Sequence, residues 1–304
     1  MPSQIISKTI LNKTKRRDPW FLDDYTLNPY SGCSFNCLYC YIRGSKYGEH
    51  MEEKLSIKIN AEELLEKQLR LRAKKNQHGI IVMSSATDPY LHVEKDTQLT
   101  RRLLEIILAY RFPLHVITKS DLVIRDFDLL EKINAQAILP PDLEGRLAHK
   151  VFITFSFSTI DDSIGNIFEP SATPPSVRLK TLQAAAGNGF MSGVSMMPLL
   201  PFITDTAEQL ETMFSTFKSA GAKYIFPASL TLFGNGHADS KTLVMRAIEK
   251  HYPHLLDKYR NIFTKYDQAP YSYTDELKRR TQLLNEKYGI PERLIFFPAA
   301  GNEK

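Results

Sequence analysis

The sequence predicts an α/β protein built on a parallel sheet and followed by a helical extension. Short, continuous apolar runs such as Ile80–Met83 and Val151–Phe157 are typical of strands that are buried on both faces of a sheet. Longer segments with helical periodicity separate these runs, and the alternation continues to about residue 227. Strands that alternate with helices in this way form right-handed βαβ units, so we expect a parallel sheet.

The expected elements follow one another regularly. Asn60 and Glu63 form a capping-box pattern at the start of the first helix, which continues to about Arg72. Gly187 and Gly189 mark the end of a later helix, because glycine is common just past a helix terminus. The six expected strands are Asp24–Ser31, Ile80–Met83, Leu114–Thr118, Val151–Phe157, Met191–Met197 and Tyr224–Pro227. The later helices are expected near Gln98–Tyr110, Phe127–Asn134, Pro174–Asn188 and Asp205–Ala220.

The two ends of the chain differ in character from this α/β region, which we place at residues 21–235. Residues 1–20 form a basic N-terminal arm that we expect to be solvated, because runs of like charge usually are. Residues 236–304 form a C-terminal helical extension with proline breaks between its helices. The helices expected in the extension are Lys241–Lys250, Leu255–Thr264 and Thr274–Tyr288.

Composition indicates an ordinary globular protein of a reducing compartment. Of the 304 residues, 43% are hydrophobic and 24% are charged. The net charge of +5 is compatible with a nucleic-acid partner and equally with a merely basic enzyme. The first residues lack the apolar core of a secretion signal, and no apolar run approaches the length of a membrane span. With its cysteines unpaired, the protein is expected in the cytoplasm, with no membrane partner.

All three cysteines lie in one aromatic-rich stretch, as Cys33, Cys37 and Cys40 with C-x3-C-x2-C spacing. Three thiolates from one loop can hold an iron–sulfur cluster, which usually takes four cysteines, and would leave one iron open. Two other interpretations exist. The cysteines could be small buried hydrophobes, or they could bind zinc together with a histidine, for which His50 is the nearest downstream candidate.

The cysteine loop resembles the signature of the radical S-adenosylmethionine (SAM) superfamily. An aromatic residue, Tyr39, precedes the last cysteine, as in that family. The surrounding phrase Asn28-Pro29-Tyr30-Ser31-Gly32-Cys33 and Tyr41 resemble more narrowly the spore photoproduct lyase-related branch, often labelled DNA repair photolyase-like. The resemblance covers roughly residues 5 to 235 and includes the segments Ser85–Tyr90, Ile117–Ser120 and Glu169–Arg178.

This resemblance implies a fold, two cofactors and a type of reaction. The fold is a partial (βα)6 TIM-like barrel over residues 21–235. The cofactors are a [4Fe-4S] cluster and SAM, served by a low-potential electron donor of the flavodoxin or ferredoxin type. Reductive cleavage of SAM gives a 5′-deoxyadenosyl radical, which abstracts a hydrogen atom from the substrate. The protein supplies orientation and exclusion of water.

The resemblance also assigns cofactor-binding residues at the strand ends. Tyr39 would contact the adenine through its main chain, and Lys119 would meet the SAM carboxylate. Asp88 would either bind SAM or cap its turn. Thr87 and a serine at the end of the fourth strand, Ser156 or Ser158, would supply hydroxyls to SAM, although local backbone bonding is the usual role of such residues.

Two further residues and one departure from the family concern the reaction itself. Tyr41 matches a tyrosine near the substrate of the lyase and is our candidate catalytic hydrogen relay. Arg178 would form an ion pair with Glu169 or contact an anionic substrate. The lyase has an additional cysteine that returns a hydrogen atom to the product radical, and here Ser85 occupies the matching position. Because a serine O–H bond is too strong to replace a thiol, either Tyr41 serves or the reaction differs.

The leading hypothesis is therefore a radical SAM enzyme, lyase-like, that acts on a nucleic-acid or nucleotide lesion. One alternative is radical SAM modification of a peptide or a small molecule. The other is a zinc-binding nucleic-acid module.

Overall fold

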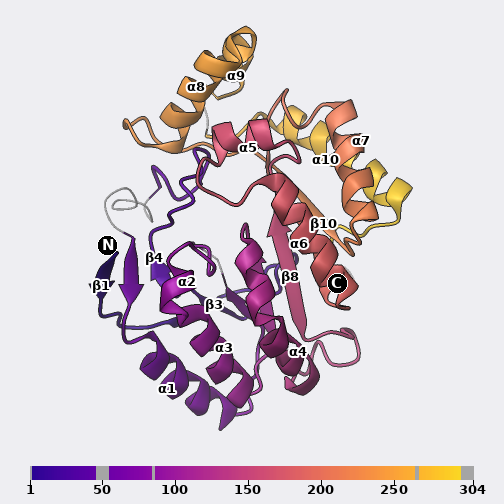
Figure 1. Cartoon of the computed structure of the whole chain (residues 1–304). Helices are drawn as coiled ribbons and strands as arrows, with labels where there is room; N and C mark the ends of the chain where they lie inside the picture. The colour runs from indigo at the N-terminus through magenta and orange to yellow at the C-terminus, as the bar shows by residue number, and fades with distance from the viewer. Residues whose placement is uncertain (1, 46–54, 84–85, 264–266, 296–304) are drawn as a thin grey trace, which may run out of the picture.

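A computed structural model describes residues 2–45, 55–83, 86–263 and 267–295 (Figure 1). The fold is mixed α/β, and its main sheet has seven strands in the order β10-β9-β8-β7-β6-β3-β2. In chain order these strands are β2 (Leu11–Lys13), β3 (Tyr25–Leu27), β6 (Ile81–Met83), β7 (Leu114–Thr118), β8 (Val151–Ser156), β9 (Met191–Leu199) and β10 (Ile225–Ser229).

All neighbouring strands of this sheet are parallel except β2, which pairs antiparallel with β3 at one edge. From β3 to β10, the order of the strands across the sheet is the same as their order in the sequence. The sequence therefore predicted the parallel sheet correctly, and five of its six expected strands match observed strands to within about two residues. The sixth, Asp24–Ser31, is divided into β3 and β4 (Tyr30–Ser31).

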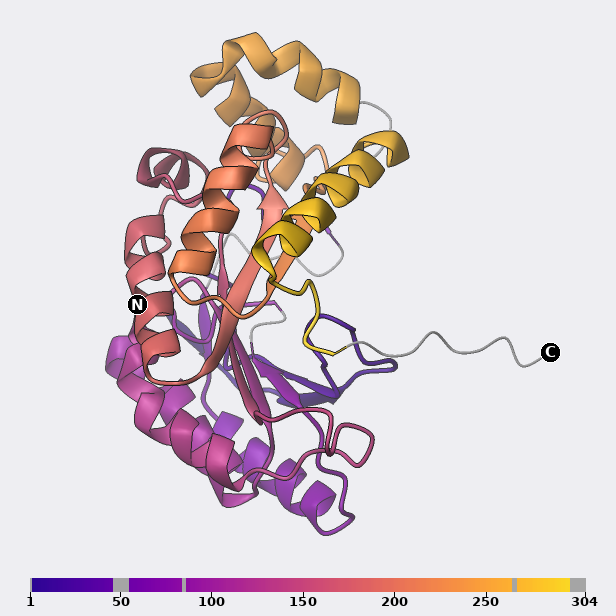
Figure 2. The ribbon, with the colours of Figure 1, turned by 90° about the vertical axis from the view of Figure 1, so that its right-hand side faces the viewer.

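Helices cover one face of the main sheet, as Figure 2 shows. They are α1 (Ala61–Ala73), α3 (Leu99–Ala109), α4 (Phe127–Gln136), α6 (Pro175–Gly187), α7 (Ala207–Ser219) and α10 (Tyr271–Tyr288). Their apolar sides meet alternate residues of the strands, such as Ile153 and Phe155 of β8, in the largest hydrophobic cluster of the described residues. Alternate strand residues point to opposite faces, so the remaining set faces the concave side.

The N-terminal segment is not a solvated arm. Two of its stretches are strands: β2 extends the main sheet, and β1 (Ser3–Ile5) pairs in parallel with β5 (Ser56–Lys58) in a smaller sheet that also contains β4. Asn60 contributes to this anchoring, because its side chain exchanges two hydrogen bonds of 2.9 Å with the backbone of Ser7. For the same reason the predicted capping box is wrong, since Asn60 makes no capping bond to α1.

Beyond β10 the chain is helical, as expected. It forms α8 (Ser240–His251), the short η2 (Pro253–Leu255), α9 (Leu256–Phe263) and α10. Helices α8 and α9 lie at one end of the molecule (Figures 1 and 2). Helix α10 instead packs against α7 and β10. Four short helical elements were not predicted, namely η2, α2 (Glu94–Thr97), η1 (Asp121–Asp126) and α5 (Asp162–Phe168).

The lower part of the concave face, away from the carboxyl ends of the strands, is filled by a second apolar layer. Leu22, Phe152 and Ile295 are buried there, so residues from both ends of the chain meet over the sheet. None of the helices within the described ranges is long and apolar enough to cross a lipid bilayer.

Candidate active site

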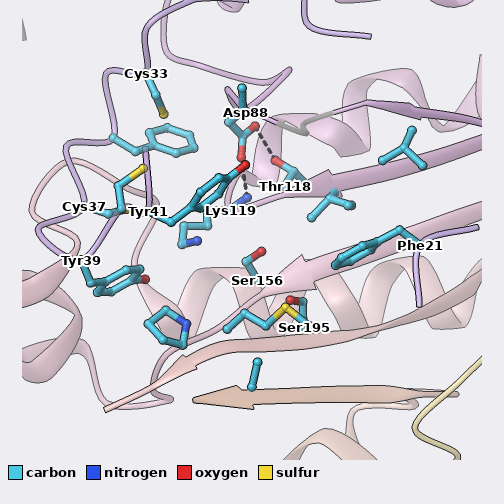
Figure 3. Close-up of a pocket in the computed structure, with 18 of the residues that line it drawn as sticks. Phe21, Cys33, Cys37, Tyr39, Tyr41, Asp88, Thr118, Lys119, Ser156 and Ser195 are labelled. Atoms are coloured by element: carbon cyan, nitrogen blue, oxygen red, sulfur yellow. Dashed lines mark hydrogen bonds between the residues drawn. The ribbon is translucent and has the colours of Figure 1, made fainter. Parts of the chain in front are cut away.

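A cavity of about 540 Å³ opens on the concave face where the parallel strands end (Figure 3). Its wall includes Asp88 after β6, Lys119 after β7 and Ser156 at the end of β8. Parallel α/β proteins bind ligands at the carboxyl ends of their strands. The cavity therefore lies where strand order alone would place a site.

The three cysteines, Cys33, Cys37 and Cys40, all line this cavity. Burial, with the negative charge of Asp88, raises the pKa of the Cys33 thiol to about 11. Burial also raises the pKa of Cys37, against the opposing effect of the Lys119 ammonium. Thiols in such dry surroundings lose their protons when a metal centre supplies the compensating positive charge.

This donor set fits an iron–sulfur cluster. A [4Fe-4S] cluster takes each cysteine at a different iron, so its ligands need not converge on one point. Within the described ranges, no three His, Cys, Asp or Glu side chains are grouped closely enough to hold a single metal ion. His50, the candidate fourth ligand of a zinc site, lies outside the described residues.

The segment Phe168–Ser171, which begins at the last residue of α5, runs alongside the cysteine loop. The backbone N–H of Leu38 donates to the carbonyl of Phe168 at 2.9 Å, and that of Ser171 donates to the carbonyl of Phe35 at 3.2 Å. These two bonds lie on either side of Cys37 in the sequence. The path of the loop is therefore fixed from outside as well as by its own turns.

Glu169, within this segment, is the centre of a buried polar network. It accepts hydrogen bonds from the phenol of Tyr39 and from the hydroxyl of Ser158, the latter at 2.8 Å, and it pairs with Arg178. Burial alone would raise the pKa of Glu169, but Arg178, Lys119 and the two hydroxyl donors hold it below its ordinary value. The ion pair confirms one of the two interpretations given for Arg178.

Asp88 joins the ends of two strands. Its Oδ1 accepts from the backbone N–H of Tyr90 and from the hydroxyl of Thr118, both at 2.8 Å, and its Oδ2 accepts from the N–H of Lys119 at 2.7 Å. Burial raises its pKa, partly offset by these bonds. Asp88 therefore caps its turn, one of the two roles considered for it, while its side chain also forms part of the cavity wall.

Lys119, Tyr41 and Ser156 come together around the cavity, as Figure 3 shows. The Lys119 ammonium lies 5.9 Å from the centre of the Tyr39 ring. The Tyr41 side chain, which is 51% exposed, extends across the cavity towards Asp88. The structure thus places five of the predicted cofactor-site or catalytic residues on one cavity with the cysteines.

Two predicted residues lie elsewhere. Thr87 is not among the described residues that line the cavity, and its hydroxyl donates to the carbonyl of Tyr30 at 3.5 Å. Ser158 is also absent from that lining, and its hydroxyl is bonded to Glu169. Of the two serines considered at the end of β8, the cavity takes Ser156.

The sequence interpretation missed several other residues that line the cavity. Asp18, Phe21 and Asp23 reach it from the segment before β3, and Ser195 reaches it from β9. Ser195 could have been predicted once the register of β8 and β9 was known, because it is the β9 neighbour of Ser156. The segment before β3 has a distinctive composition, with the only tryptophan of the chain, Trp20, and three aspartates after Arg17. This composition does not indicate where the segment lies in the fold.

The family model of the radical SAM superfamily matches residues 27–214, from β3 to within α7. The matched range contains all three cysteines and most of the cavity wall. The chain belongs to the radical SAM superfamily. This family binds a [4Fe-4S] cluster and SAM, which agrees with the cysteine donor set.

Relatives of this radical SAM protein occur in bacteria and archaea. An uncharacterised protein of Mycobacterium tuberculosis is 26% identical over 293 residues, covering 94% of this chain and 81% of its own. Another, from Methanocaldococcus jannaschii, is 29% identical over 187 residues, covering 60% of this chain and 62% of its own.

The fold is similar to that of spore photoproduct lyase. A variant of that enzyme with bound SAM and dinucleoside spore photoproduct superposes with a TM-score of 0.64 at 16% identity, over 94% of this chain and 78% of that one. The lyase complexed with dinucleoside spore photoproduct gives a TM-score of 0.63 at 17% identity, with the same coverage. At these identities the likeness concerns the fold.

Proposed function

We propose that this protein holds a [4Fe-4S] cluster through Cys33, Cys37 and Cys40 and uses it to cleave SAM reductively. The observation that carries the proposal is that all three cysteines open onto one strand-end cavity that they share with Lys119. When bound, the cluster and SAM supply a 5′-deoxyadenosyl radical, which removes a hydrogen atom from the substrate. We propose a nucleic-acid or nucleotide lesion as that substrate, in keeping with the branch that the sequence resembles.

The residues of the wall would orient SAM. Lys119 offers an ammonium to the SAM carboxylate, a charge-assisted contact that is stronger than a neutral hydrogen bond. Ser156 offers a hydroxyl, and the main chain at Tyr39 offers polar groups to the adenine. Asp88 would act mainly by fixing the backbone of Lys119, because its carboxylate already accepts from that N–H group. Thr87 and Ser158 would support this wall from behind.

Tyr41 is the proposed hydrogen donor to the product radical. It lines the cavity with the cysteines, and its phenol O–H is the type of bond that such a relay needs. Ser85, which stands at the position of the lyase's additional cysteine, lies outside the described residues. The proposal for Tyr41 therefore rests on its place in the cavity and on the lack of any cysteine outside the loop.

Three wider proposals accompany this function. The parallel sheet with helices on one face would be a partial (βα)6 barrel over residues 21–235, with residues 236–304 as its helical extension. A flavodoxin- or ferredoxin-type protein would deliver the electron. The enzyme would act in the cytoplasm, where a reducing environment keeps the cysteines available.

Anaerobic reconstitution with iron and sulfide, followed by dithionite and SAM, tests the proposal. We expect release of 5′-deoxyadenosine by the wild type and loss of this activity in Cys37→Ala. Ser34→Ala is the matched control in the same loop, because the buried Ser34 hydroxyl has no hydrogen-bond partner among the described residues. Equal activity in Cys37→Ala, or a colourless protein with stoichiometric zinc and no sulfide, would contradict the proposal.

A second candidate is radical SAM chemistry on a peptide or small molecule. The observation that favours it is the charge of the cavity, whose described lining contains Asp18, Asp23 and Asp88 but Lys119 as its one cation. Such a lining would repel phosphate groups at close range. Binding of oligonucleotides that weakens linearly in log salt would favour a nucleic-acid substrate, and the absence of such binding would favour this second candidate.

A further inference from the structure

A buried charge pair lies directly behind the cysteine loop and has no part in the proposed reaction. Glu169 is 3% exposed and its partner Arg178 is 0% exposed. Burying such a pair is costly, and apolar residues of similar volume often stabilise a fold as well or better. The position of the pair therefore points to a role other than stability.

The contacts of the pair lead to both the loop and the cavity wall. Glu169 accepts from the phenol of Tyr39, which stands between Cys37 and Cys40 in the sequence. Arg178 donates to the carbonyl of Ser156, a residue of the cavity wall. The backbone bonds of the segment Phe168–Ser171 hold the same loop from the same side. Movement of this pair would therefore displace the loop and the wall together.

The charge of Glu169 also acts on the cysteine loop electrostatically. Its carboxylate accepts a hydrogen bond from Tyr39, two residues from Cys37, so its negative charge lies beside the loop. Tyr39, Glu169 and Arg178 are all buried, so a fixed charge here acts on a charge in the loop through dry surroundings. Any centre that gains an electron next to Cys37 would experience the same fields.

We propose that Glu169 is a positioning residue for the cysteine loop, and that the balance of its charge with Arg178 sets the reduction potential of the cluster. This inference rests on the proposed function. A nearby negative charge opposes the addition of an electron, so removing it makes reduction easier, whereas removing the positive partner makes it harder. Protein charges and hydrogen bonds near a cluster are among the factors that set its potential.

Redox titration of the reconstituted full chain, followed by the electron paramagnetic resonance signal of the reduced cluster, tests this inference. We expect Glu169→Gln to raise the midpoint potential and Arg178→Met to lower it, each by about a tenfold change in the ratio of reduced to oxidised protein at fixed potential. For a one-electron couple, tenfold is about 59 mV. The double variant, which removes both charges, should return close to the wild type.

Glu94→Gln is the control. Glu94 is also a fully buried carboxylate with an arginine partner, Arg125. Its other side-chain bonds go to Tyr30, Thr97, Thr100 and Arg101, none of which belongs to the loop residues 33–41. This variant should lose stability without a change in potential.

Two results would overturn the inference: equal potentials in the wild type and both single variants, or a shift in the same direction for both. If one single variant does not fold, the other still shows the direction of the change in midpoint potential. The double variant still shows whether that potential returns to the wild-type value. A wild type that takes up no iron and sulfide would overturn the proposed function itself. That result is distinct, because the inference alone fails only when clusters are present and their potentials do not respond.

Discussion

The two ends of the concave face differ in character although the same strands build them. On β8 the side chains of Phe152, Thr154 and Ser156 all point to this face, because they are two residues apart. Phe152 is packed in the apolar layer, Thr154 bonds to His115 at 2.6 Å, and Ser156 lines the cavity. Along β8 the surroundings of these side chains thus change from an apolar layer, to a buried hydrogen bond, to the open cavity. Position along the strand separates residues that hold the fold from residues that can meet a ligand.

The largest effect is expected at the apolar end. Phe152→Ala should lower the free energy of unfolding by about 3–5 kcal/mol, because it removes a large buried side chain and leaves a void. Urea denaturation measures this loss. The matched change at the open end, Ser156→Ala, should leave stability nearly unchanged. Similar losses in both variants would show that the two ends are not distinct.

The middle of the face should respond to acid. His115 is buried, and its two ring nitrogens bond to the carbonyl of Phe21 at 2.8 Å and to the hydroxyl of Thr154. Burial lowers its pKa from 6.5 to about 4, so the folded state holds it neutral. Its contribution to stability is present above pH 6.5 and is lost as pH falls towards 4, by up to about 3 kcal/mol.

Unfolding free energies of the wild type and His115→Gln between pH 4 and 8 measure this effect. The difference between the two proteins isolates His115 from the carboxylates that also titrate in acid. We expect the stability curve of the variant to be flatter between pH 6.5 and 4. Parallel curves would show that His115 is not held neutral.

The smallest effect separates two serines at the end of the strand. Ser156→Ala should weaken SAM binding by roughly 0.5–1.5 kcal/mol, the usual net value of one hydrogen bond, without a change in stability. Ser158→Ala should lower the free energy of unfolding without a change in SAM binding, because the Ser158 hydroxyl donates to the buried Glu169. Calorimetric titration of reconstituted protein with SAM, beside urea denaturation, checks both. A shared phenotype would remove the distinction between wall and support.

The sequence predicted the features that depend on local pattern. The alternation of strands and helices, the cysteine loop and the strand-end positions of Asp88, Lys119 and Ser156 all follow from periodicity and spacing. The features it did not predict depend on long-range partners. Asn60 has the pattern of a helix cap, but the backbone of Ser7 takes its side chain. Phe21 carries no local signal of its position in the cavity, because that position is set by strands that follow it in the chain.

The lower layer of the concave face has a consequence for the order in which the protein is completed. Leu22 precedes the cysteine loop in the sequence, whereas Ile295 follows α10. Both are buried in the same apolar cluster. During synthesis the cysteine loop is made long before Ile295, the residue that completes the apolar layer beneath the cavity. Stable insertion of a cofactor should therefore await synthesis of the segment that carries Ile295.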